Sequence, residues 1–188
     1  TRSRLSRLDA RGVTDGGVAR ASVLKRLFNR PCTPAEGVLA LQRMIAEAMK
    51  NAPGRAILLM VDGPSGVGKT SFVRQIERRG DAVIAVHRDD YLDVWYGKSG
   101  RTYSSIDWRG LGRRVQGFAR LKAARLVICE GYRVSEIGGY FDLKALIIAG
   151  PGTRLDNLAA DKSFLSKKSC DYRKPGFYYD LIIDNSKT

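Results

Sequence analysis

The sequence feature that most constrains this chain is an eight-residue loop pattern, Gly63-Pro64-Ser65-Gly66-Val67-Gly68-Lys69-Thr70, which matches G-x-x-x-x-G-K-[ST] at every position. A continuous apolar run at 56–61 precedes it and is typical of a strand buried on both faces of a parallel sheet. Residues 71–79 follow it with a helical pattern. A strand, a glycine-rich loop and a helix in this order are the context in which the pattern binds phosphate.

Each residue type in the loop has a physical reason to be there. Glycines let backbone N–H groups curl around a β-phosphate, and the helix N-terminus adds partial positive charge. Lys69 is expected to bridge the β- and γ-phosphates, and the Thr70 hydroxyl to ligate Mg²⁺. We therefore predict ATP and Mg²⁺ as ligands, the alternative being a glycine-rich turn with a chance Lys-Thr pair. The predicted nucleotide-binding residues here are Gly63, Ser65, Gly66, Val67, Gly68, Lys69, Thr70 and Ser71.

Helices and strands alternate along the remainder of the chain. A helix is expected to begin after the capping box Thr33-Pro34-Ala35-Glu36 and to end near residues 51–54. The other expected elements are a strand at 82–86, a helix at 106–124, and strands at 126–129, 144–149 and 181–183. This alternation predicts an α/β fold of the P-loop NTPase type, a five-stranded parallel sheet with helices on both faces and a leading helix.

Composition limits the class of protein and its surroundings. The chain has 188 residues, 44% of them hydrophobic, which is enough for one core and excludes a disordered tail protein. Its apolar runs are far shorter than the roughly 20 residues of a membrane span, so no span is expected. Three cysteines without a CxxC pair and a single histidine argue against a disulfide scaffold or a structural zinc site. An intracellular, reducing compartment is therefore expected.

Charge is the unusual part of the composition. Lysine and arginine total 33 against 19 acidic residues, so the net charge is +14 and an anionic partner is expected. Residues 1–31 hold eight basic and two acidic residues. We predict a basic N-terminal extension, 1–32, that contacts RNA or an acidic partner, before a nucleotide-binding domain, 33–188. An arginine- and serine-rich start is also typical of organelle targeting, which leaves the cytoplasm and the mitochondrial matrix open.

An acidic pair follows the second expected strand, in the segment Asp89-Asp90-Tyr91. The carboxyl ends of parallel strands form the ligand edge of an open α/β sheet. A carboxylate at that edge can accept a hydroxyl proton while a phosphoryl group is transferred. A solvated acidic turn is the alternative interpretation.

The loop and the acidic segment together resemble the P-loop kinases of the uridine kinase, nicotinamide riboside kinase and phosphoribulokinase group, over residues 56–188. The resemblance implies a kinase-like domain that transfers the γ-phosphoryl group of ATP to a small-molecule acceptor. It further implies that Asp89 is the general base and that Asp90 and Tyr91 line the acceptor site.

Three further segments take their expected roles from the same resemblance. Asp107, which is followed by Trp108, matches the carboxylate that holds ribose hydroxyls in the family, so both are expected at the acceptor. Glu130 ends an apolar strand in Glu-Gly and would assist the magnesium site. The loop at Asn185 and Ser186 looks like the family's loop that packs against adenine.

The segment after the fourth expected sheet strand departs from the family. Gly152-Thr153-Arg154-Leu155 resembles the start of the family's lid, and Arg154 is expected to act on the phosphates. The arginines that follow in the family are missing, and Asp156 and Asp161 stand in this segment instead. Arginines at a transferring phosphoryl group contribute several orders of magnitude to rate, so this depletion bears on catalysis.

Two hypotheses from different classes follow. The first is an ATP-dependent kinase acting on a hydroxyl of a nucleoside-like or sugar-like molecule, with Lys69, Asp89 and Arg154 as catalytic residues. The second is a catalytically degraded, kinase-fold subunit of a large assembly such as an organellar ribosome, which keeps a nucleotide site and uses its basic arm. A GTPase or motor ATPase ranks below both, because the chain has no Asn-Lys-x-Asp motif and little room for a motor's lid domain.

Overall fold

The computed structural model describes residues 31–78, 82–96, 102–137, 141–150, 152–154, 156 and 178–186. Nearly all of the predicted basic extension lies outside the described residues. The same is true of the lid segment beyond Arg154, apart from Asp156. Within the described part of the chain, no helix is long and apolar enough to cross a membrane.

Five parallel strands form the central sheet, in the order β2-β5-β1-β6-β7. Their bounds are β1 (Ile57–Asp62), β2 (Val83–His87), β5 (Leu126–Gly131), β6 (Leu143–Ile148) and β7 (Leu181–Asp184). Every residue of β1 and β5 is buried, as expected for central strands covered on both faces. The predicted five-stranded parallel sheet and the α/β class are confirmed.

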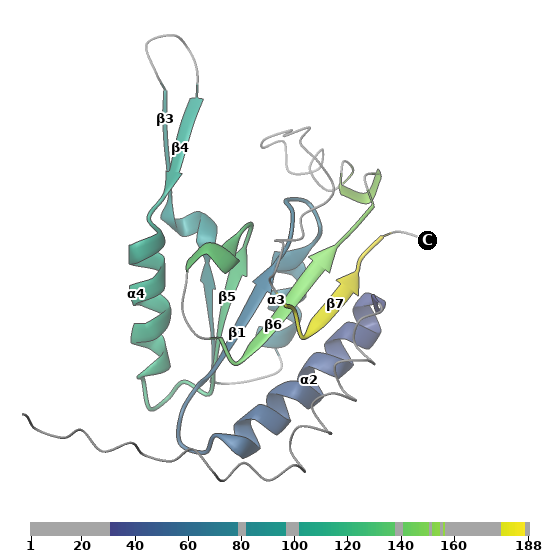
Figure 1. The fold of residues 1–188 in the computed structure, drawn as a ribbon, viewed down its shortest axis with the longest axis vertical. Coiled ribbons are helices and arrows are strands. Elements are labelled where there is room, and N and C mark those ends of the chain that lie inside the picture. The colour runs from purple at the N-terminus through teal and green to yellow at the C-terminus, as the bar shows by residue number, and fades with distance from the viewer. Residues whose placement is uncertain are drawn as a thin grey trace, which may run out of the picture.

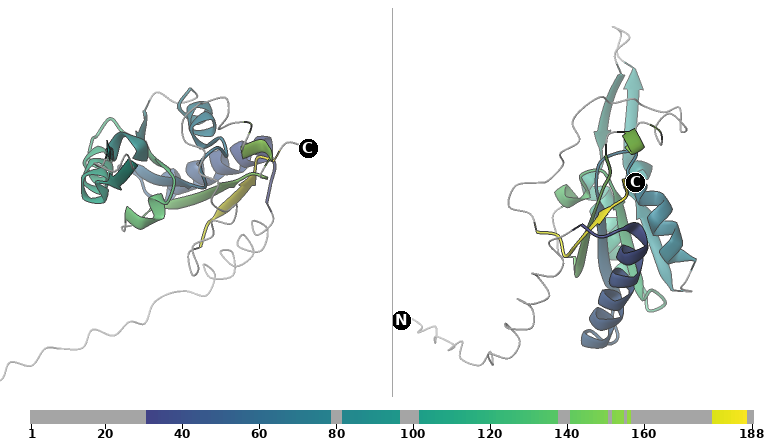
Figure 2. Two further views of the ribbon diagram at one scale, coloured as in Figure 1. Left: turned by 90° about the horizontal axis from the view of Figure 1, so that it is seen from above. Right: turned by 90° about the vertical axis from the view of Figure 1, so that its right-hand side faces the viewer.

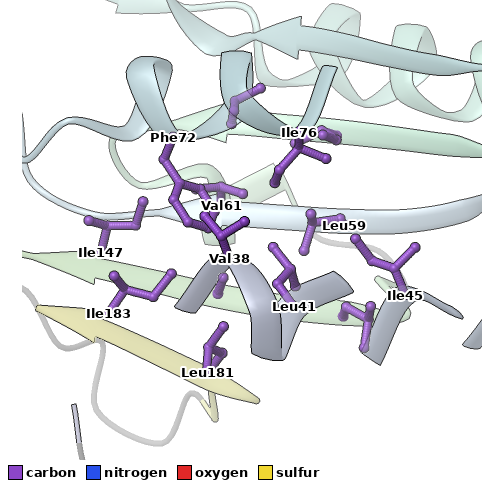
Figure 3. Close-up of a cluster of buried hydrophobic side chains, with 14 of the residues drawn as sticks. Val38, Leu41, Ile45, Leu59, Val61, Phe72, Ile76, Ile147, Leu181 and Ile183 are labelled. Carbon is purple, nitrogen blue, oxygen red and sulfur yellow. The ribbon is translucent and has the colours of Figure 1, made fainter. Parts of the chain in front are cut away.

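Helices cover both faces of this sheet, as predicted. Alternate residues of β1, from Ile57 to Val61, pack with α2 (Pro34–Asn51) and α3 (Lys69–Glu77) in one core cluster. Leu58 and Met60 point the other way and pack with α4 (Trp108–Ala119) in a second cluster. Figure 3 shows the first cluster, where Val38, Leu41 and Ile45 of α2 meet β1, β6 and β7.

The leading helix α2 begins where the sequence predicts. Thr33 accepts a hydrogen bond from the Glu36 backbone N–H, and Glu36 accepts one from the Thr33 N–H, so the capping box is complete. Just before it, Cys32 pairs with the edge strand β7 through backbone hydrogen bonds to Ile182 and Asp184. This pairing ties the start of α2 to the outer strand of the sheet.

A two-stranded hairpin, β3 (Leu92–Tyr96) and β4 (Thr102–Ile106), interrupts the alternation of helices and parallel strands. It follows a short 3₁₀ turn, η1 (Arg88–Tyr91), and projects beyond the carboxyl ends of the sheet strands (Figure 1). The expected helix at 106–124 is therefore wrong at both ends. Ile106 pairs in β4, Asp107 caps the helix, and the chain leaves the helix after Ala119.

The topology decides which groups meet at the ligand edge. The strand before the glycine-rich loop, β1, lies between β5 and β6, so residues at their carboxyl ends surround the loop. Figure 1 shows α4 beside β5 and α2 near β7. Figure 2, seen from above, also separates α4 and α2 across the sheet. Together with the glycine-rich loop between β1 and α3, this strand order identifies the fold as the predicted P-loop type.

Candidate functional site

The glycine-rich loop joins the buried strand β1 to the first turn of α3. Gly66 and Gly68 have φ angles of 80° and 87°, in the left-handed region that suits glycine, and Gly68 is the N-cap of α3. A Cβ on Gly63 would lie 2.2 Å from the Ile147 carbonyl oxygen of β6. Only glycines therefore allow this curled backbone at the N-terminus of a helix, which is where anions bind.

Lys69 is buried, and its ammonium turns back onto the loop, where Nζ donates to the Pro64 carbonyl at 2.8 Å. Burial lowers the pKa of Lys69, and the carboxylates of Glu130, Asp62 and Asp89 oppose that shift. The nearby Arg88 guanidinium adds to the lowering. These couplings place groups from the ends of β1, β2 and β5 within electrostatic range of a single ammonium.

A hydrogen-bonded chain links α3 to two strand ends. The Thr70 hydroxyl donates to Glu130 Oε1 at 3.0 Å, and His87 Nδ1 lies 2.8 Å from the same oxygen. Glu130 and His87 are register partners on β5 and β2, and the Glu130 carboxylate is buried. A hydroxyl and a carboxylate oxygen side by side are the hard donors that Mg²⁺ prefers.

This donor pair fits a magnesium ion shared with phosphates better than a closed protein cage. Among the described residues, no group of three or more His, Cys, Asp or Glu side chains could hold a metal. Mg²⁺ in phosphate-transferring sites is usually held by one or two protein oxygens, with waters and phosphate oxygens completing its shell. Thr70 and Glu130, both predicted as metal residues, therefore lie together in an arrangement that fits the ion.

Asp62 is a fully buried carboxylate at the end of β1 that the sequence patterns did not single out. Its Oδ1 accepts from the backbone N–H groups of Gly63 and Arg133, and its Oδ2 accepts from Ser135 N and the Tyr179 hydroxyl. It thereby ties the start of the glycine-rich loop to the turn after β5 and to the residues before β7. The signal in the sequence was an acidic residue ending an otherwise apolar strand.

The remaining predicted nucleotide residues gather around the same loop. Asn185 donates from Nδ2 to the Val67 carbonyl at 2.9 Å, and Ser186 accepts from the Gly150 N–H at 2.8 Å. Arg154 is buried, and its Nε donates to the Ser65 carbonyl at 3.1 Å. Ser71 is exposed on the first turn of α3. Arg154, the predicted lid arginine, and Asn185, from the predicted adenine loop, therefore both contact the glycine-rich loop.

The acidic segment after β2 forms the turn η1, and its carboxylates face solvent. The Asp89 side chain is 75% exposed and pairs with Arg88, whose Nη1 lies 2.6 Å from Asp89 Oδ1. Asp90 is also exposed, whereas Tyr91 is half-buried against the α4 core cluster. The candidate base is thus accessible to an acceptor while an arginine restrains it.

Arg88 is a second residue that the sequence patterns missed. Its side chain is only 16% exposed, and its guanidinium lies 5.9 Å from the centroid of the Trp108 ring. A Cβ on Gly131 would lie 2.4 Å from Arg88 Cβ, so the glycine after Glu130 makes room for this stem. Its buried Nε has no hydrogen-bond partner among the described residues. An arginine directly before the acidic pair was the available signal.

The two predicted acceptor residues after β4 also have local structural roles. Asp107 is the N-cap of α4, and its Oδ1 accepts from the Gly110 N–H at 2.8 Å. The Asp107 backbone N–H donates to the Tyr91 carbonyl at 3.1 Å, which places it beside the acidic turn. Trp108 is half-buried against the α4 core cluster and faces Arg88. Both therefore adjoin the turn that carries Asp89.

Comparison with known proteins gives likeness in fold. No family model and no curated protein matches the sequence. Similar solved structures include a candidate fructose transport system kinase from Silicibacter sp. TM1040, 12% identical, with a TM-score of 0.46 over 66% of this chain and 81% of that one. Another is a candidate uridine kinase from Bacillus stearothermophilus, 17% identical, with a TM-score of 0.45 over 77% of this chain and 100% of that one. At such identity the likeness concerns fold alone.

Proposed function

We propose that this protein is an ATP- and Mg²⁺-dependent phosphotransferase acting on a hydroxyl of a nucleoside-like or sugar-like small molecule. The observation that carries the proposal is the glycine-rich loop at the N-terminus of α3, where the buried Lys69 ammonium lies next in sequence to Thr70, whose hydroxyl donates to the buried Glu130 carboxylate. We assign phosphate binding to Lys69, metal binding to Glu130 and the role of general base to Asp89, which follows the neighbouring strand β2. Phosphoryl transfer needs groups in these three roles.

The nucleotide half of the site is ready to hold anions. Bound ATP would supply the phosphoryl group, and bound Mg²⁺ would offset the charge on its phosphates. Lys69 exchanges its hydrogen bond to the Pro64 carbonyl for one to phosphate oxygens, while Thr70 and Glu130 provide metal ligands. Arg154 adds a guanidinium beside the loop.

The acceptor half receives the proton of the attacking hydroxyl. Asp89 accepts that proton, and Arg88 orients its carboxylate through their ion pair. Asp107, which lies beside the same turn, would accept hydrogen bonds from further hydroxyls of the acceptor, a role supported by its exposed carboxylate and its backbone contact with Tyr91. We assign Asp90, Tyr91 and Trp108 to the walls of this half, and Asn185 and Ser186 to the adenine side.

The test is transfer of labelled γ-phosphate from ATP to a panel of nucleosides, nicotinamide riboside, pentoses and pentose phosphates. Lys69→Ala and Asp89→Asn are expected to lower transfer to one acceptor by two orders of magnitude or more, on the scale of positioned acid–base and electrostatic groups. The matched controls are Lys50→Ala on the exposed last turn of α2 and Asp93→Asn on the exposed strand β3. Both controls should keep wild-type rates.

The two variants separate the parts of the proposal. If Lys69→Ala loses ATP binding and Asp89→Asn keeps it, the nucleotide and acceptor halves are as assigned. Wild-type protein that binds ATP but phosphorylates no member of the panel would contradict the proposed acceptor class. Wild-type protein that binds no ATP would overturn the proposal and favour the degraded, structural subunit.

A further inference from the structure

The charge of the described residues is concentrated in one segment. Residues 108–129 contain five arginines, one lysine and no acidic residue, whereas the other described residues contain ten basic and fourteen acidic side chains. All six cations are exposed. We call them the α4 basic face, and its members are Arg109, Arg113, Arg114, Arg120, Lys122 and Arg125.

None of these six cations forms an ion pair with another residue in the described part of the chain. The ion pairs found among the described residues involve Arg55, His87, Arg88 and Arg133, and none reaches the α4 basic face. Exposed cations of one sign repel each other and lower the stability of the helix that carries them. Six exposed cations with no ion pair among the described residues therefore form a surface whose charge is complementary to that of a polyanion.

The helix sets three of the arginines in a line. Arg109, Arg113 and Arg120 are spaced by four and seven residues, which places them on one stripe of an α-helix. Leu111 and Val115 occupy the opposite, buried face. At 1.5 Å per residue the stripe is about 16 Å long, which matches several successive phosphates of a nucleic-acid strand.

A neighbouring arginine is held in place by an aromatic ring. The Arg114 guanidinium lies 4.3 Å from the centroid of the Phe118 ring, one helical turn further along α4. Stacking on a ring restricts the guanidinium while leaving its N–H groups free of that contact. The α4 basic face thus combines a linear stripe with a stacked cation about 100° further around the helix from Arg113.

Nucleotide binding at the glycine-rich loop does not account for this charge. The loop leads into α3, which packs on the sheet face opposite α4. Figure 1 shows α4 running along the flank of the sheet, beside β5 and away from β7. Lys122 and Arg125 follow the end of α4, on the way to the start of β5 and therefore far from the ligand edge.

We infer that the α4 basic face binds the phosphate backbone of a nucleic acid. Arginine outnumbers lysine five to one, and its planar guanidinium matches phosphate oxygens in two-pronged hydrogen bonds. A membrane surface is a poorer match, because Leu121 is the one large exposed apolar side chain among residues 108–129. This surface lies in the folded domain and belongs to a different segment of the sequence from the predicted basic extension.

The test measures binding of a fluorescein-labelled, 20-nucleotide single-stranded RNA to the full chain by anisotropy, across a series of salt concentrations. Two triple variants are compared. The α4 triple carries Arg109→Gln, Arg113→Gln and Arg120→Gln. The control triple carries Arg43→Gln, Arg74→Gln and Arg78→Gln, which removes equal charge from exposed positions on α2, on α3 and at the end of α3. Each lost contact to a single strand should reduce the log–log salt slope by about 0.7, so the first triple should flatten it by about 2. The control should leave the slope unchanged.

The inference would be overturned by no RNA binding of the wild-type chain, by equal losses in the two triples, or by an unchanged slope in the α4 triple. Preferential binding of the wild-type chain to phosphatidylserine vesicles over RNA would do the same, because it would assign the face to a membrane. Circular dichroism of both triples confirms that they remain folded. Since all six arginines are exposed, neither triple is expected to unfold the chain.

Discussion

The two halves of the candidate site are built in different ways. The nucleotide half consists of a glycine loop with left-handed residues, a buried lysine that donates to the loop, and a buried carboxylate, Glu130, that accepts from Thr70 on α3. The acceptor half lies on a 3₁₀ turn and a helix cap, and its carboxylates Asp89 and Asp107 are exposed. The glycine-rich loop therefore lies next to a surface on which each of these two carboxylates is held by one partner, Asp89 by Arg88 and Asp107 by the Gly110 N–H.

This difference has a physical origin in the sheet. Central parallel strands are held on both sides, so the register of β1 against β5 and β6 determines where each strand end lies. The turn η1 follows an edge strand, β2, and leads into the projecting hairpin. Its side chains have neighbours on fewer sides, so they can adjust when an acceptor binds.

The largest expected effect comes from removing the carboxylate that joins the loop to the rest of the sheet edge. Asp62→Ala leaves four donors without their acceptor, three of them backbone N–H groups, and should lower the free energy of unfolding by about 3 kcal/mol. Urea denaturation measures the loss, with Asp93→Ala on the exposed strand β3 as control. Equal midpoints for the two variants would contradict the role given to Asp62.

A glycine pair tests whether the cradle depends on backbone conformation. Gly68→Ala must adopt a φ of 87° and bring its Cβ within 2.7 Å of Asn185 Nδ2, so it should lose about 1–3 kcal/mol of stability and weaken ATP binding. Gly117→Ala in α4 meets nothing within 4 Å and should gain about 0.5–1 kcal/mol. In thermal melts, the stabilities of the two variants should therefore shift in opposite directions. ATP titration should show weaker binding by Gly68→Ala. A stabilised Gly68→Ala would refute the cradle argument.

The acceptor half should be separable from the nucleotide half. Arg88→Gln removes the cation that orients Asp89, and misplaced groups cost on the order of tenfold to a hundredfold in rate. The expected result is a lower kcat with the ATP dissociation constant unchanged, and Arg88→Lys should restore part of the rate. Steady-state kinetics with varied acceptor and ATP measure the split. A parallel loss of ATP affinity would show that the halves are not independent.

The smallest expected effect lies at the opposite end of the sheet and serves as a reference. Burial acts to raise the pKa of Asp142, but the hydrogen bonds from Arg55 and from the Leu58 N–H hold that pKa below its ordinary value. The charged carboxylate therefore stabilises the fold above the unfolded-state pKa of about 3.9, and this contribution is lost as pH falls through the lowered folded-state pKa. Asp142→Asn should flatten the acid limb of a stability–pH curve without affecting ATP binding. An unchanged acid limb would contradict the pairing.

Local sequence signals predicted most of the regular structure. The capping box placed the start of α2, the continuous apolar runs placed β1, β5, β6 and β7, and the complete loop pattern placed the cradle before α3. The hairpin was missed, although its strands are rich in aromatic and β-branched residues and flank the Gly97-Lys98-Ser99-Gly100 segment. The expected helix began too early because Asp107 is a helix cap, whose sequence signal is short, and it ran past Arg120, the C-cap.

The glycine-rich loop and the helix after it follow from local sequence, because they depend on backbone conformation within a few residues. The residues that contact the loop and its neighbours come together only through the sheet. Glu130 and His87 are 43 residues apart, and Asp62 and Tyr179 are 117 residues apart, so their contacts depend on strand order and register. The pairing of Arg88 with Asp89 is local, but Trp108 and Gly131 from other elements bury the arginine. Hydrogen bonds between buried groups distant in sequence exist only once the sheet has formed.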